Sequence, residues 1–186
     1  MDRSMRPGVV ARLGQRIRDS RQALDLSVAA LAERSGISRR MLTQIELGQA
    51  NPSVATLDLV AAGLGTTFAA LMGVSSETPP DGVEVWSTPT GSWAILLDAI
   101  DTADMSVETW KWRVVAGDEF IGESGTPSPG HMLHVIEGEV DIVGDEGVRT
   151  IGVGESVRVG GGAEHGYRVR EGAAVFLVVA LQSRGG

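Results

Sequence analysis

The sequence contains no cysteine, which excludes disulfide bonds and thiolate metal sites. No stretch approaches the ~20 consecutive apolar residues that a membrane-spanning helix needs. The first residues, MDRSMRPGVV, also lack the apolar run of a signal peptide. Hydrophobic residues still make up 42% of the 186 residues, enough for a packed core in each half of the chain. We therefore expect a soluble cytoplasmic protein with no membrane partner.

The net charge of −8 divides unevenly along the chain. Residues 1–73 hold nine arginines and six acidic residues, a balance of 9 − 6 = +3. Residues 74–186 hold seven basic and eighteen acidic residues, a balance of 7 − 18 = −11. A basic first part joined to an acidic second part favours attraction of a phosphate backbone at one end only. The same charges would also serve plain solubility, so a nucleic-acid partner needs the support of a motif.

The first part of the sequence has the apolar spacing of helices. Ser27, Ser38 and Ser53 stand where they can cap helices, and Gly36 and Gly65 can end helices in the left-handed conformation. The pattern predicts five helices, at residues 10–24, 28–34, 39–47, 54–64 and 67–72.

After residue 74 the sequence changes to short β-branched or aromatic runs separated by glycines. Strands are expected at residues 83–87, 93–97, 107–115, 132–136, 140–143, 148–151, 156–159, 166–170 and 174–181. Many short strands with no long helix between them predict an antiparallel sandwich or barrel. We therefore expect an α+β protein of two domains, with an all-α domain at residues 8–73, a linker at 74–82 and an antiparallel β-barrel at 83–181.

Residues 27–48, SVAALAERSGISRRMLTQIELG, have the layout of two short helices joined by a turn at Gly36. Ile37, Leu42 and Ile45 would lie beneath the second helix. Its other side offers four polar side chains: Arg39, Arg40, Thr43 and Gln44. Arginine can form two hydrogen bonds with guanine, and glutamine with adenine, so this helix suits the major groove of DNA. A helical bundle that binds another protein is the alternative.

At these residues the chain resembles the lambda-repressor-like, or XRE, helix-turn-helix family, over about residues 13–72. The resemblance rests on Arg18 with Leu24, Leu31-Ala32, Gly36-Ile37-Ser38, Ile45-Glu46 before Gly48, Asn51-Pro52-Ser53, and Ala61 with Leu64-Gly65.

The resemblance implies roles for individual residues. The residues that would read base edges are Arg39, Arg40, Thr43 and Gln44. Ser27 and Asn51 would lie near backbone phosphates, and Ser38, at the start of the reading helix, belongs to the same DNA-binding set. Arg21 and Glu46 would form a structural ion pair. Two positions depart from the family, with Val28 where glutamine is common and Asp25 where glycine is common.

Residues 154–165, GESVRVGGGAEH, resemble the second motif of the cupin family. Gly154, Gly162 and His165 match it, and Gly160 stands where proline is usual. Gly138 matches the end of the first cupin motif. This alignment places His131 where the family has a glutamate ligand, and residues 124–127, which are Ser-Gly-Thr-Pro, where it has two histidines.

The cupin resemblance covers about residues 83–181 and implies a jelly-roll barrel. It leaves only His131 and His165 as candidate metal ligands, and two histidines leave a transition metal under-ligated. We therefore expect an incomplete metal site and no cofactor. His134, three residues after His131, should face the other side of the strand.

A small-molecule effector is the alternative to a metal in the barrel. Glu108, Trp110 and Trp112 alternate along one expected strand and so share a face, while Lys111 and Arg113 point away. If that face is interior, the residues opposite would be His131, His165 and Tyr167. The set suits a small amphipathic molecule, and an indole face also accepts a cation. The other interpretation is that both tryptophans only pack in the core.

Three functions follow from these motifs. The first is a ligand-responsive transcriptional regulator that binds a two-fold, double-stranded DNA operator as a homodimer joined through its cupin parts. The second is an enzyme, because iron-dependent epoxidases and dioxygenases also join an XRE-like domain to a cupin. Those need two histidines and a carboxylate, a pattern that this chain lacks before Gly138. The third is an interaction module whose barrel only dimerises. We expect the regulator and no enzyme activity.

Overall fold

The computed structural model describes residues 7–74, 81–102, 104–122, 129–145, 147–160 and 165–183. Five helices come first: α1 (Pro7–Ala23), α2 (Val28–Arg34), α3 (Arg39–Glu46), α4 (Val54–Leu64) and α5 (Phe68–Met72). Ser27, Ser38 and Ser53 each accept a hydrogen bond from the backbone N–H three residues further on. Gly65 ends α4 with a φ of 70°. These short-range contacts place the helices where the sequence predicts them, with some ends shifted by a few residues.

The helices pack around aliphatic side chains that are almost fully buried. The most buried of these are Ile17, Leu31, Leu42, Ile45, Leu57 and Val60. Gly14 lets α1 approach the end of α3, since a Cβ at this position would collide with the backbone carbonyl oxygen of Ile45. Within the described residues, no helix is long and apolar enough to cross a membrane.

Ten strands follow the helices within the described ranges. They are β1 (Val83–Ser87), β2 (Trp93–Asp101), β3 (Met105–Val115), β4 (Glu119–Gly122), β5 (Gly130–Glu137), β6 (Glu139–Gly144), β7 (Gly147–Gly152), β8 (Ser156–Val159), β9 (His165–Arg168) and β10 (Ala173–Ser183). Nine of them correspond to expected strands, and several are longer than the sequence predicts. The strand β4 was not expected, and it is held by antiparallel pairing with β9.

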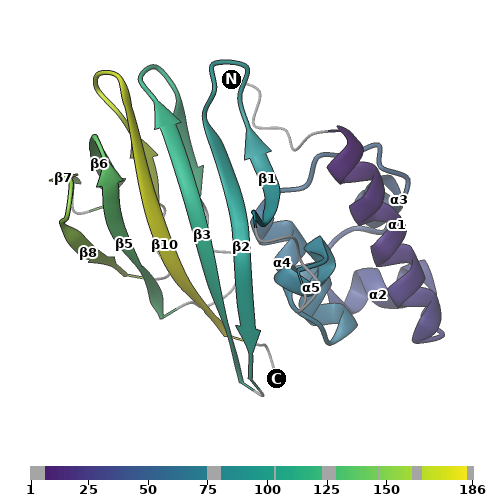
Figure 1. Ribbon diagram of the computed structural model, residues 1–186. Helices are drawn as coiled ribbons and strands as arrows, with labels where there is room; N and C mark the ends of the chain where they lie inside the picture. Colours follow the sequence, from purple (N-terminus) through teal and green to yellow (C-terminus); the bar gives the residue numbers. More distant parts are fainter. Residues whose placement is uncertain are drawn as a thin grey trace.

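The strands form two antiparallel sheets. One has the order β1-β2-β3-β10-β5-β8 and the other β4-β9-β6-β7. From β3 onward the chain crosses between the sheets after every strand except β6, which forms a hairpin with β7. This is the strand order of a jelly roll, the double-sheet architecture of cupins. The strands β1 and β2 extend the first sheet toward the helices (Figure 1).

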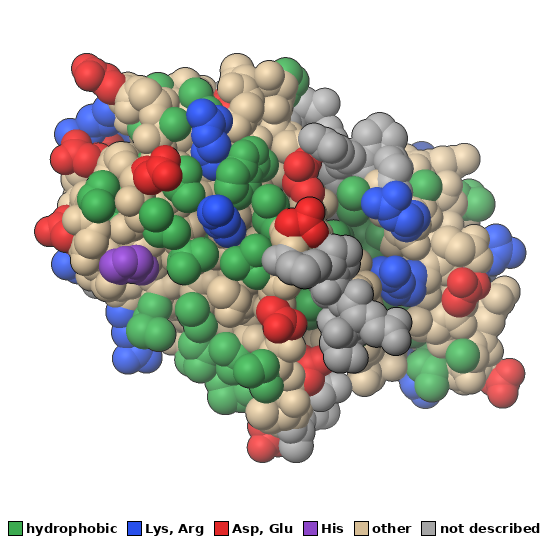
Figure 2. Space-filling view, viewed as in Figure 1, with side chains coloured by type: hydrophobic (Ala, Val, Ile, Leu, Met, Phe, Trp, Pro, Cys, Tyr) green, Lys and Arg blue, Asp and Glu red, His purple; other side chains and the backbone are tan. Residues whose placement is uncertain are grey.

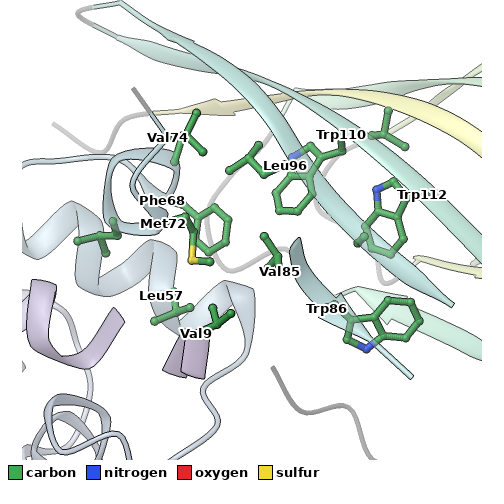
Figure 3. Packing of buried hydrophobic residues seen from close by; sticks show 14 of the residues in the cluster. Val9, Leu57, Phe68, Met72, Val74, Val85, Trp86, Leu96, Trp110 and Trp112 are labelled. Carbon is green, nitrogen blue, oxygen red and sulfur yellow. The ribbon is translucent and has the colours of Figure 1, made fainter. Parts of the chain in front are cut away.

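The helical domain packs against the β1–β2 side of the larger sheet (Figure 1). Phe68 of α5 stacks on Trp110 of β3 with ring centroids 5.9 Å apart, and Leu96 and Val85 lie beside them (Figure 3). Thr67 Oγ1 donates a hydrogen bond of 3.2 Å to Asp101 Oδ2. The helices and the sheets therefore share one continuous hydrophobic cluster. Of the expected linker, residues 75–80 lie outside the described residues.

Candidate functional site

Helix α3 has one apolar and one polar side. Leu42 and Ile45 face the core and are 0% and 1% exposed. On the other side Arg39, Arg40 and Thr43 are exposed, and Gln44 is half-buried. The helix begins at Ser38, whose Oγ accepts a hydrogen bond from the Met41 N–H at 3.1 Å. The four residues expected to read base edges thus form one accessible surface.

The two arginines of this surface are available for contacts outside the protein. Within the described part of the chain, neither Arg39 nor Arg40 takes part in a side-chain hydrogen bond or an ion pair. Thr43 Oγ1 donates to the carbonyl oxygen of Arg39 at 2.8 Å, which leaves its methyl group and a lone pair at the surface. Ser27 at the start of α2 and Asn51 before α4 are both exposed. A long cationic side chain without a partner is suited to a DNA base or phosphate.

A buried ion pair fastens α1 to the end of α3. Arg21 donates from Nε to Glu46 Oε1 at 2.6 Å and from Nη2 to Oε2 at 2.9 Å. Its Nη1 donates to the carbonyl oxygen of Leu26 at 2.8 Å. The hydrogen bonds to Glu46 raise the pKa of Arg21 above its ordinary value. The structure thus brings together the two residues expected to pair, and the pair sets the orientation of α3.

The inner face of β3 carries the residues predicted to line an effector pocket. Glu108, Trp110 and Trp112 are 3%, 7% and 7% exposed, while Lys111 and Arg113 lie on the other face. Trp112 contacts side chains of the opposite sheet, with ring centroids 4.5 Å from Phe120 and 5.5 Å from Tyr167. This face of β3 is therefore interior. Both tryptophans are also part of the aromatic core.

The histidines and the tyrosine of the predicted pocket lie together inside the jelly roll. The rings of His131 and His165 are 4.6 Å apart, and a hydrogen bond of 2.6 Å joins Tyr167 Oη to His131 Nε2. Burial, together with repulsion from His165, lowers the pKa of His131 to about 4, so His131 is neutral near pH 7. Burial raises the pKa of Tyr167 above its ordinary value. His134 is exposed on the outer face.

Glu108 is a buried carboxylate that receives one hydrogen bond from the part of the chain that the structure describes. Trp110 Nε1 donates to its Oε2 at 3.0 Å. Burial raises the pKa of Glu108 to about 7, with added repulsion from Asp58 of α4 and Asp101 of β2. Burial also raises the pKa of Asp58 to about 7. Sequence reasoning did not find Asp58, because nothing in the pattern of α4 shows that it faces the barrel. It did not find Asp101, because the expected strand ends at Leu97 and β2 continues to Asp101.

The residues of the barrel do not fit the metal that many cupins hold. Tyr167 already occupies Nε2 of His131. Among the described residues, no group of three or more His, Asp or Glu side chains is arranged to hold an ion. Residues 124–127, where the family has its first histidines, lie outside the described residues and are Ser-Gly-Thr-Pro. Two imidazoles alone leave a transition metal under-ligated.

Comparisons with known proteins address both parts of the chain. Residues 17–71 match the family model HTH_3, helix-turn-helix. The transcriptional regulator SutR of Escherichia coli (strain K12) is 28% identical over 84% of this chain and 86% of its own length. The immunity repressor protein of Bacillus phage phi105 is 41% identical over 33% of this chain and 42% of its own length.

A solved structure shares the arrangement of both domains. It is that of an HTH_3 family transcriptional regulator from Vibrio cholerae, with a TM-score of 0.64 and 22% identity over 95% of this chain and 98% of that chain. At this identity the likeness shows a common fold.

The fold and the motif define a protein with an amino-terminal helix-turn-helix DNA-binding domain and a carboxy-terminal jelly roll. Residues 17–71 therefore carry a helix-turn-helix of the HTH_3 type, and over most of its length the chain is similar to the transcriptional regulator SutR.

Proposed function

We propose that the chain reads a specific double-stranded DNA operator through the exposed side of α3. Arg39, Arg40, Thr43 and Gln44 contact base edges, and Ser27, Ser38 and Asn51 lie toward the phosphates. Residues 8–73 form the reading domain and residues 83–181 the barrel, and the protein acts in the cytoplasm, where its DNA lies. The observation that carries this proposal is the surface of α3, on which two exposed arginines have no partner among the described residues while the opposite side is fully buried.

The test begins with selection of duplexes from a random library by the purified chain. Arg39→Ala and Arg40→Ala should each weaken binding of the selected duplex by ~1–3 kcal/mol and relax the sequence preference. Arg149→Ala is the matched control, because Arg149 is an exposed arginine on β7 of the smaller sheet. Gel-shift titrations in which both α3 variants bind like the unchanged chain would refute the assignment.

We also propose that two chains associate through the outer face of the larger sheet. Met132, Ile136 and Ile100 are 55%, 40% and 69% exposed there, and Leu177 and Val179 of β10 lie half-buried between them. Figure 2 shows hydrophobic side chains gathered over this sheet. An exposed apolar patch on a folded protein marks an interaction surface. A two-fold operator requires two copies of α3, so a second copy of this chain is the partner.

The oligomeric state tests this face directly. Light scattering should give a mass near twice the 19.5 kDa of one chain. Met132 and Val179 are register partners on β5 and β10, and changing both to lysine should yield monomers. Val153→Lys replaces an equally apolar residue, 65% exposed, outside this face. A monomeric unchanged chain, or a dimeric double variant, contradicts the proposal.

We further propose that the barrel receives a small-molecule effector and performs no catalysis. The effector contacts Glu108, Trp110 and Trp112 on β3 and the cluster of His131, His165 and Tyr167. The support is the convergence of polar groups from β3, β5 and β9 in an aromatic interior. Metal analysis of the purified chain separates this from the oxygenase alternative, since stoichiometric iron would favour an enzyme. A thermal-shift screen with no responding compound would instead favour a barrel that only dimerises.

A further inference from the structure

Three buried polar atoms on the inner face of β3 have no hydrogen-bond partner within the described part of the chain. They are Ser106 Oγ, Glu108 Oε1 and Trp112 Nε1, in residues that are 2%, 3% and 7% exposed. Buried polar groups in folded proteins are nearly always hydrogen-bonded, because burial removes their water without replacing it. Ser106 Oγ and Glu108 Oε1 lie two residues apart on this face, and both can accept a hydrogen bond from a molecule outside the chain.

The neighbours of Glu108 in the sheet offer no side-chain hydrogen bond to its carboxylate. Its register partners are Ala99 on β2 and Ala180 on β10. Residues in register on neighbouring strands are about 5 Å apart and share a face, so two methyl groups flank the carboxylate. The next inward-facing residue, Trp110, occupies Oε2. Oε1 is therefore the carboxylate oxygen that lacks a donor among the described residues.

The helical domain brings a second carboxylate to this position. Asp58 of α4 and Asp101 of β2 lie close enough to Glu108 to repel its negative charge. Phe68 on α5, which also belongs to the helical domain, stacks on Trp110 (Figure 3). Among the described residues, no arginine, lysine or histidine forms an ion pair with any of these three carboxylates. Water could form hydrogen bonds with Ser106 Oγ and Glu108 Oε1, but it would not neutralise the negative charge of the carboxylates.

We propose that the junction of Asp58 and Glu108 binds a small organic cation, whose N–H groups reach Glu108 Oε1 and whose body lies against Trp110. This inference rests on the proposed function, in which the barrel receives an effector. An organic cation fits better than a metal ion, because the described residues hold no group of three or more ligands arranged for a metal. An indole face attracts an organic cation, and amine, amidine or guanidine N–H groups donate hydrogen bonds to carboxylate oxygens.

A cation at this junction touches both domains and therefore acts on the position of α3. It replaces repulsion between α4 and β3 by attraction of both to one charge. Helix α4 packs closely on α2, since a Cβ on Gly63 would collide with Ser35 Oγ. The helix-turn-helix formed by α2 and α3 follows α4 as one body. In a dimer, the cation thus changes how the two α3 helices meet successive turns of the DNA.

The test uses the full chain and probes that differ in charge at nearly constant shape. Benzamidinium, benzamide and benzoate are respectively cationic, neutral and anionic, and methylguanidinium is a smaller cation. Binding is measured at about pH 8 and constant ionic strength, by tryptophan fluorescence and by the thermal midpoint. At least one cation should bind, and benzamide and benzoate should not.

Three variants locate the bound cation. Glu108→Gln and Asp58→Asn each remove one charge with little change of shape, and each should weaken cation binding about tenfold or more. Glu171→Gln, at an exposed position between β9 and β10, should leave it unchanged. Loss of binding in Glu108→Gln alone would confine the ligand to the barrel and overturn the junction. No response to either cation, or equal binding of the neutral and anionic probes, would overturn it as well.

Gel shifts on the same samples separate this inference from the proposed function. A chain that binds the selected duplex but neither cation refutes only the junction site. A chain that binds a cation, loses it in both variants, and binds no DNA supports the site and refutes the operator-reading role.

Discussion

Replacement of Glu108 by glutamine tests the electrostatics of the domain junction through protein stability. The change removes a negative charge but keeps the size of the side chain and an oxygen that can accept the hydrogen bond of Trp110. Glu108 is 3% exposed. Burial raises its pKa from 4.5 to about 7, with repulsion from Asp58 and Asp101 added to it. The charged form is therefore disfavoured in the folded protein.

The sign of the effect follows from proton binding by Glu108. Between about pH 4.5 and 7 the folded state keeps a proton that the unfolded chain has released, so the free energy of unfolding falls as pH rises. A pKa increase from 4.5 to about 7 is worth about 3 kcal/mol, at about 1.36 kcal/mol for each pH unit. The glutamine variant has no such loss. It should be more stable than the unchanged chain by up to about 3 kcal/mol at about pH 8, and nearly equal to it at about pH 4.5.

Urea denaturation followed by tryptophan fluorescence at both pH values measures this difference. Groups that do not interact with Glu108, such as His131, contribute equally in both chains and cancel in the comparison. Relief of the repulsion between Glu108 and Asp58 adds to the difference in the same direction. Glu171→Gln, at an exposed position, should show no difference at either pH. A glutamine variant that is less stable at about pH 8, or a difference that does not change with pH, would refute the view of Glu108 as a desolvated carboxylate without a cationic partner.

Three other substitutions test the helical packing and the histidine pair. Glu46→Gln should cost ~3 kcal/mol in urea denaturation, because it leaves the buried guanidinium of Arg21 without its counter-charge; equal stability would contradict this. Gly14→Ala should destabilise the helical domain by ~2 kcal/mol and weaken DNA binding, since the added Cβ meets the backbone of Ile45. Unchanged stability and unchanged DNA affinity would show that α1 and α3 can move apart at no cost. His131→Gln should make the free energy of unfolding less sensitive to acid. Burial lowers the pKa of His131 from 6.5 to about 4, so the unchanged chain loses up to about 3 kcal/mol of that free energy as pH falls through this range. Parallel stability curves for the two chains would contradict the last prediction.

The helices could be predicted closely because their limits depend on near neighbours. Ser27, Ser38 and Ser53 cap helices through backbone N–H groups only three residues away. Gly65 ends α4 because its φ of 70° is costly for other residues. Such contacts are present in any short window of the sequence.

The strands show where this kind of prediction ends. Residues 119–122 have no marked alternation, and β4 exists because Phe120 and its neighbours pair with β9, which lies far along the chain. The strand β2 continues beyond its expected end at Leu97, through an irregularity in its pairing with β3. Pairing partners at long range decided both features.

The sequence by itself determined which residues share a face. Strand alternation puts Glu108, Trp110 and Trp112 together, and helical spacing puts Arg39 and Arg40 opposite Leu42, because both patterns are set by backbone geometry within a few residues. Only the tertiary structure decided what covers those faces. Phe68 came to lie on Trp110, and Asp58 to lie near Glu108, because the helical domain packs on the sheet. Burial and repulsion between distant segments have no local pattern, so the raised pKa of Glu108 became visible only in the folded chain.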